Sequence, residues 1–179
     1  MKGGYPMEKP LTVLGFALGM ENNGLEFFKR AAKTVRDPNA KMIFLDLMKM
    51  EEGHIAYIKA NIESIKEKGR WQLKPIEGYD EGKTAETVFK AREEGKAGET
   101  EFEIGEMTSD LSAIRIALAI ENDLYEFYSR ASAHAKGQDA KAVFKKLSEW
   151  EKEHREMLEA QYEEMREGFW SKMGFSPFD

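Results

Sequence analysis

Hydrophobic residues recur every three or four positions along four long stretches of this 179-residue chain. That spacing places them on one face of an α-helix. The predicted helices cover residues 10–35, 38–69, 109–136 and 139–167. The second helix has the clearest start, because Asp37 can cap it and Pro38 suits a first helical turn. Gly168 is expected to end the fourth helix.

The four predicted helices fall into two pairs, residues 10–69 and 109–168, joined by a connection over residues 70–108. A connection of about forty residues is too long for a hairpin loop. We therefore expect it to cross from one end of a helix bundle to the other, with a short helix at Thr84–Glu94. The chain is predicted to be one all-α domain, an antiparallel four-helix bundle with a short C-terminal helix in the tail 169–179.

The two helix pairs repeat one another. Residues 14–63 and 114–163 align without a gap at an offset of 100, and sixteen of the fifty aligned positions are identical. Each repeat has a Glu-x-x-His motif on its second helix and, thirty residues earlier, a glutamate on the apolar face of its first helix. These residues are Glu21, Glu51 and His54 in the first repeat, and Glu121, Glu151 and His154 in the second. The third histidine, His134, lies near a predicted helix end and outside this pattern.

The repeated motif indicates a metal site. Residues three apart share a helix face, so each motif directs a carboxylate and an imidazole the same way. Four buried carboxylates would be very costly as unpaired anions, and the predicted inward positions include no Lys or Arg. Two divalent cations would neutralise them. Oxygen and nitrogen donors suit iron or manganese, although zinc or copper could also bind such a site in vitro.

A Glu from each of two helices and a Glu-x-x-His from each of the other two is the ligand pattern of ferritin-like di-iron and di-manganese bundles. The stretches that carry this pattern resemble the erythrin (ferritin-like) domain of rubrerythrins. They are residues 17–28, 44–54, 117–128 and 144–154. The resemblance covers both helix pairs and implies a ferritin-like bundle that binds two iron ions, with manganese or zinc as possible replacements.

The resemblance also implies roles for individual residues. The metal ligands would be Glu21, Glu51, His54, Glu121, Glu151 and His154. Glu51 and Glu151 would bridge the two ions, and each histidine would bind one. Tyr128 matches a family tyrosine that hydrogen-bonds a ligand carboxylate, whereas its repeat partner is Phe28, which has no hydroxyl.

The chain departs from the rubrerythrin pattern in two ways. The family usually has another glutamate one turn after the third-helix ligand, where this chain has Leu124 and, in the other repeat, Gly24. We therefore expect a symmetric six-ligand site. Typical rubrerythrins also carry a rubredoxin domain with four cysteines, and this chain has no cysteine. Electrons are expected to come from a separate donor, such as a rubredoxin-like protein.

The composition argues against several other classes of protein. Without cysteine there are no disulfides, thiolate metal sites or thiol catalysis, and a net charge of −6 argues against a nucleic-acid surface. No stretch approaches the roughly 18 uncharged apolar residues that span a bilayer, and no signal peptide is recognisable. We expect a cytoplasmic protein.

The implied function is the reduction of peroxide or dioxygen at a di-iron site. Two alternatives stay open from the sequence: a ferroxidase or iron-binding protein without peroxidase turnover, and a metal-stabilised structural dimer. We expect a homodimer, and the long crossover would allow two copies to exchange helix pairs. In an exchanged dimer, each site would combine the first-repeat ligands of one chain with the second-repeat ligands of the other.

Overall fold

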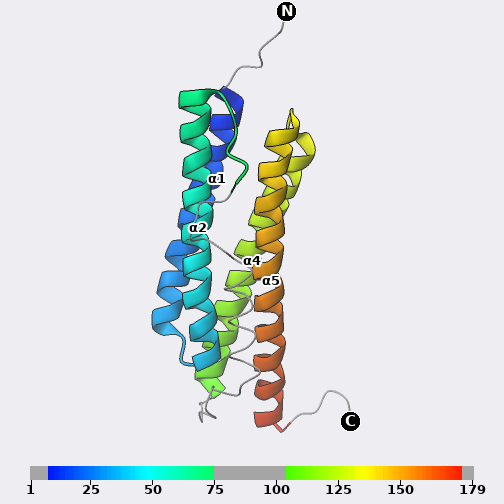
Figure 1. Cartoon of the computed structure of the whole chain (residues 1–179). Helices are drawn as coiled ribbons and strands as arrows, with labels where there is room; N and C mark the ends of the chain where they lie inside the picture. The colour runs from blue at the N-terminus through cyan, green and yellow to red at the C-terminus, as the bar shows by residue number, and fades with distance from the viewer. Residues whose placement is uncertain (1–7, 75–103, 175–179) are drawn as a thin grey trace, which may run out of the picture.

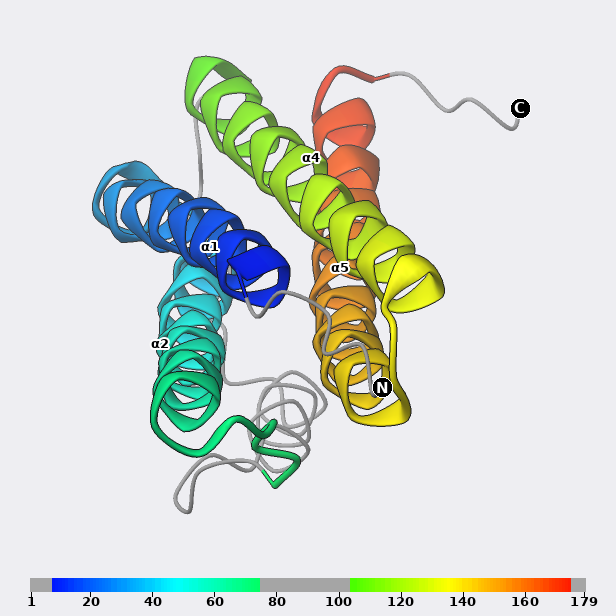
Figure 2. The same cartoon turned by 90° about the horizontal axis from the view of Figure 1, so that it is seen from above.

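The computed structural model describes residues 8–74 and 104–174. These residues form four long helices, which are α1 (Glu8–Thr34), α2 (Pro38–Lys68), α4 (Ile104–His134) and α5 (Gln138–Lys172). α1 and α5 run in one direction along the bundle, and α2 and α4 run in the other (Figure 1). Helix α1 packs on α2 and α4 packs on α5. Viewed from above, α1 also lies beside α4, and α2 lies beside α5 (Figure 2). The predicted all-α bundle of two helix pairs is confirmed.

The connection between the pairs joins opposite ends of the bundle, because α2 ends at one end and α4 begins at the other (Figure 1). Its first residues are held against the bundle. The backbone N–H of Gln72 donates to Oδ1 of the buried Asn61 at 3.0 Å, and the ring of Trp71 packs edge-on against Phe144. The short helix predicted at Thr84–Glu94 lies outside the described residues.

The boundaries of α2 follow the capping signals in the sequence. Asp37 accepts a hydrogen bond from the backbone N–H of Ala40 at 2.7 Å, and Pro38 begins the helix. Gly69 ends it with a φ of 65°, in the left-handed region that glycine enters without steric cost.

Two predicted boundaries were wrong. Helix α5 does not stop at Gly168 but runs to Lys172, so the start of the predicted tail is part of α5. A single glycine costs a helix only about 1 kcal/mol, and the left-handed turn falls instead at Gly174, with a φ of 68°. Helix α4 begins at Ile104 rather than at residue 109, so Asp110 lies within the helix.

Asp110 instead joins the two helix pairs. This buried carboxylate accepts hydrogen bonds from the backbone N–H groups of Arg36 and Asp37, at 2.9 and 2.8 Å. Both donors lie in the turn between α1 and α2, so one side chain of α4 satisfies the polar backbone of a turn in the other pair.

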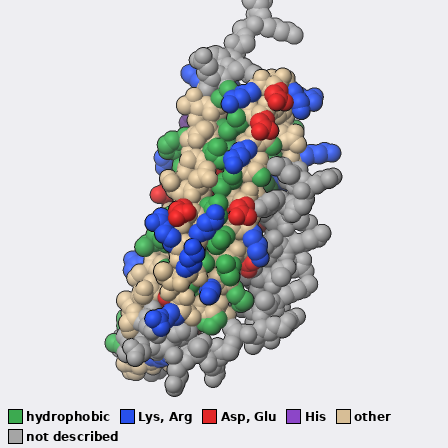
Figure 3. All heavy atoms as spheres, turned by 90° about the vertical axis from the view of Figure 1, so that its left-hand side faces the viewer, with side chains coloured by type: hydrophobic (Ala, Val, Ile, Leu, Met, Phe, Trp, Pro, Cys, Tyr) green, Lys and Arg blue, Asp and Glu red, His purple; other side chains and the backbone are tan. Residues whose placement is uncertain are grey.

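The core consists of two hydrophobic clusters, one toward each end of the bundle. One includes Phe28, Phe44, Leu47 and Ile114, and the other includes Leu14, Ile58, Phe144 and Leu147. A layer of buried polar side chains separates them along the helices. The face formed by α1 and α2 carries charges of both signs among hydrophobic side chains (Figure 3). Within residues 8–74 and 104–174, no helix has the length and apolar character needed to cross a membrane.

Replacing Asp110 with alanine should destabilise the protein by about 2–3 kcal/mol, because two backbone N–H groups lose a charged acceptor. Urea unfolding measures this change. Asp123→Ala removes an exposed carboxylate from the same helix and should change the free energy of unfolding by no more than about 0.5 kcal/mol. Equal effects of the two substitutions would show that Asp110 does not join the pairs.

Candidate metal centre

The polar layer between the two hydrophobic clusters contains all six residues that the sequence singled out. Glu21 comes from α1, Glu51 and His54 from α2, Glu121 from α4, and Glu151 and His154 from α5. All six side chains are buried, with exposed fractions of 0–1%. One chain supplies the complete set, so no exchange of helix pairs is needed to bring these residues together. His134, in contrast, is the exposed last residue of α4.

The carboxylates surround the two imidazoles in a regular way. Nδ1 of His54 lies 3.5 Å from Oε2 of Glu21, 3.4 Å from Oε2 of Glu51 and 3.0 Å from Oε1 of Glu151. Nδ1 of His154 lies 3.5 Å from Oε2 of Glu121, 3.2 Å from Oε1 of Glu51 and 3.5 Å from Oε2 of Glu151. Glu51 and Glu151 thus present one oxygen to each histidine, whereas Glu21 and Glu121 each face a single histidine.

This geometry defines two neighbouring sets of four donor atoms. Each set contains one imidazole nitrogen, one oxygen from an unshared glutamate and one oxygen from each shared glutamate. Donor atoms of Glu51, His54, Glu151 and His154 lie within 4.8 Å of one another. Nitrogen and oxygen donors in this number and spacing could hold two metal ions with two bridging carboxylates.

The cluster lacks the cations that would otherwise balance it. Neither Lys nor Arg occurs among the buried side chains of residues 8–74 and 104–174. Within the same residues, both oxygens of Glu51, Glu121 and Glu151 lack a hydrogen-bond partner. Buried carboxylates in this situation are costly unless they are protonated or bind metal. The residues therefore fit a pair of divalent cations.

Without metal, burial and neighbouring charges shift the pKa values of the cluster. Burial raises the pKa values of Glu21 and Glu121 well above their ordinary value, and the negative charges of Glu51 and Glu151 raise them further. Burial alone would lower the pKa of His154, but the Glu121 carboxylate beside it raises that pKa well above its usual range.

The two shared carboxylates behave in the opposite way. Burial acts to raise the pKa of Glu51, but the imidazole of His54 and the neighbouring Glu21 and His154 side chains bring it well below its ordinary value. The pKa of Glu151 is also lowered, against the effect of burial, chiefly by His54. The pKa shifts therefore favour protonation of the unshared carboxylates over the shared ones.

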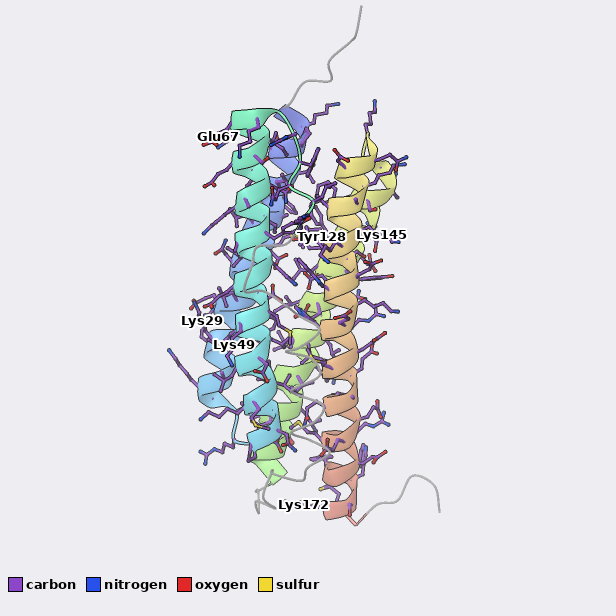
Figure 4. The ribbon with its side chains drawn as sticks, in the orientation of Figure 1. Lys29, Lys49, Glu67, Tyr128, Lys145 and Lys172 are labelled. Carbon is purple, nitrogen blue, oxygen red and sulfur yellow. The ribbon has the colours of Figure 1, made fainter. Side chains whose placement is uncertain are left out.

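Aromatic side chains pack against one half of the cluster. The hydroxyl of Tyr128 donates a hydrogen bond to Oε1 of Glu21, and Tyr128 points into the interior between the helix pairs (Figure 4). Burial raises the pKa of Tyr128 well above its ordinary value, so the phenol remains a donor. The ring of His54 is stacked between Trp150 and His154, with ring centroids 4.9 Å apart on each side.

The stacking of Trp150 on His54 was not predicted from the sequence. A signal was present, because Trp150 lies four residues before His154 and so shares its inward helix face. The two positions without the additional family glutamate are both buried. At Gly24, a Cβ atom would lie 3.4 Å from Cγ2 of Ile120, at ordinary van der Waals distance, so a side chain at this position would contact α4.

A four-helix bundle with a long crossover and a buried layer of carboxylates and imidazoles defines the class of ferritin-like metal-binding proteins. The family model described as Rubrerythrin matches residues 73–162, which is half of the chain. The chain belongs to the rubrerythrin family. A search of curated proteins and a search of solved structures each find no match.

The matched segment contains only part of the cluster. Glu121, Tyr128, Glu151 and His154 fall inside it. Glu21, Glu51 and His54 precede it, and their assignment depends on the internal repeat and on their positions in the structure. The internal repeat is therefore the sequence evidence for the three ligands that lie before the matched segment.

Metal binding should release protons, because the raised pKa values of Glu21, Glu121 and His154 favour their protonated forms and metal ligands must be deprotonated. Lower pH favours the protonated side chains, so metal affinity should fall as the pH falls. Calorimetric titration of the metal-free protein with Mn²⁺, in buffers of different ionisation enthalpy, measures the number released. A binding enthalpy that does not depend on the buffer would contradict this prediction.

Proposed function

We propose that this protein reduces peroxide, or dioxygen, at two iron ions held by the buried cluster. The proposed ligands are Glu21, Glu51, His54, Glu121, Glu151 and His154. The observation that carries the proposal is that Glu51 and Glu151 each present one oxygen to His54 and the other oxygen to His154. Membership of the rubrerythrin family supports the same chemistry. Manganese could replace iron, whereas zinc would fill the site without redox activity.

Two bound iron ions would supply the two electrons that convert hydrogen peroxide and two protons into two molecules of water. The residues of the chain bind the two ions and fix the orientation of the ligands. Glu51 and Glu151 would bridge, and His54 and His154 would each hold one ion. Tyr128 fixes the orientation of Glu21 through its hydrogen bond, and such outer contacts commonly tune a metal site.

The surroundings suit a reaction that must keep out bulk water. The two hydrophobic clusters close the polar layer along the bundle axis, and no ligand side chain is more than 1% exposed. The sequence has no cysteine that could hold a thiolate-bound iron of the rubredoxin kind. A separate electron donor, such as a rubredoxin-like protein, is therefore part of the proposal. The homodimer expected from the sequence stays a prediction.

Iron-loaded protein should consume hydrogen peroxide through many cycles when a reductant is present. Glu51→Ala removes a bridging carboxylate and should lower both the bound iron and the peroxide turnover by at least about tenfold. Metal analysis and peroxide consumption measure the two effects. Glu52→Ala changes an exposed neighbour on the same helix and should leave both values unchanged.

The same assay distinguishes peroxide reduction from a ferroxidase or iron-binding role without peroxidase turnover. Repeated turnover with reductant supports peroxide reduction. Oxidation of bound ferrous iron in a single stoichiometric step, with peroxide remaining afterwards, would instead support a ferroxidase role. Protein that binds two metal ions and oxidises neither would leave only a structural role for the centre.

A further inference from the structure

We propose that the two metal positions of this centre are unequal, and that the position formed by His54 and Glu21 binds its ion first and more tightly. The inference rests on the proposed metal centre and adds an order of occupation to it. The ligands themselves are the same in both repeats, so the difference comes from side chains that touch the ligands.

The first difference is a hydrogen bond that exists on one side of the cluster. Tyr128 donates to Oε1 of Glu21, and Oε2 of Glu21 faces Nδ1 of His54. On the other side, both oxygens of Glu121 lack a hydrogen-bond partner among the residues that the structure describes. Glu21 therefore has a second contact that holds its orientation, whereas the contact of Glu121 is with Nδ1 of His154, at 3.5 Å.

The residue equivalent to Tyr128 is Phe28, and the structure places it equivalently. The ring of Tyr128 is stacked on Phe144, with centroids 6.5 Å apart. The ring of Phe28 is stacked on Phe44, the repeat partner of Phe144, with centroids 6.1 Å apart. Since Tyr128 of α4 reaches Glu21 of α1, a hydroxyl on Phe28 of α1 would be directed at Glu121 of α4.

The second difference is a ring stack. The imidazole of His54 lies between two parallel rings, Trp150 at an interplanar angle of 5° and His154 at 6°. The repeat partner of Trp150 is the buried Met50, a flexible side chain that offers no flat surface. Trp150 therefore restrains the imidazole of the first position only.

Both differences favour the same position. A ligand that is already held in its binding orientation loses less conformational freedom when the ion arrives, and removing an outer partner of a ligand typically lowers metal affinity 10- to 100-fold. Tyr128 and Trp150 are thus positioning residues for Glu21 and His54, whereas their repeat partners Phe28 and Met50 offer Glu121 and His154 neither a hydroxyl nor a flat ring.

The test is an anaerobic titration of the metal-free full-length chain with Mn²⁺, followed by electron paramagnetic resonance and calorimetry. In the wild type, the signal of isolated Mn²⁺ should rise up to one ion per chain. It should then fall as the second ion forms a coupled pair. The two dissociation constants should differ by about tenfold or more.

Three variants assign the difference to named residues. Tyr128→Phe and Trp150→Met copy the residues of the weaker position, and each should weaken the first binding step while leaving the second unchanged. Phe28→Tyr copies the stronger position and should tighten the second step. Each of these changes should make the two dissociation constants more similar. Thermal unfolding of the metal-free variants checks that they fold.

The possible results separate this inference from the proposed centre. Wild-type protein that binds two ions in one unresolved step retains the centre and overturns the inequality. A first step unchanged by both Tyr128→Phe and Trp150→Met overturns it as well. Wild-type protein that binds no Mn²⁺ or Fe²⁺ would overturn the centre itself. If Tyr128→Phe does not fold, Phe28→Tyr decides, because an unchanged second step contradicts the role of the tyrosine.

Discussion

The fold depends on how four carboxylates and two imidazoles are accommodated in the middle of a helix bundle. None of these side chains reaches solvent, and the buried side chains of the described ranges include no Lys or Arg to balance them. Their charge must be neutralised within the layer itself, by protons in the metal-free protein or by cations in the loaded one. In the metal-free protein, the raised pKa values of Glu21 and Glu121 favour protonation, which reduces the negative charge of the layer.

The repeat and the crossover together bring the six side chains into one layer. Within each pair, a short turn places the first-helix glutamate beside the Glu-x-x-His motif of the second helix. The crossover then starts α4 at the end opposite the end of α2, so that α2 and α5 lie side by side in opposite directions (Figures 1 and 2). The two motifs therefore face one another, and each shared glutamate can reach both histidines. A hairpin connection would have reversed the second pair.

Much of this arrangement could be predicted from the sequence, because helical periodicity and an internal repeat are local signals. The faces that carry Glu51 and Glu151, and the cap at Asp37, are of this kind. Two features depended on packing between distant segments instead. Asp110 caps a turn 73 and 74 residues away, and Trp150 stacks on a histidine of another helix. Gly168 differs for a local reason, because a single glycine costs a helix only about 1 kcal/mol and the helix continues through it.

The six ligands are symmetric between the two repeats, but the side chains that contact these ligands are not. Glu21, Glu51 and His54 have identical counterparts one hundred residues later, and the histidine–carboxylate distances agree closely between the halves. Phe28 and Met50 have counterparts of different chemistry, Tyr128 and Trp150. Such positions can differ without altering the charge of the layer, because neither member of each pair is ionised. What they alter is how firmly a ligand is held, and a repeat can therefore keep the composition of its site while making its two halves unequal.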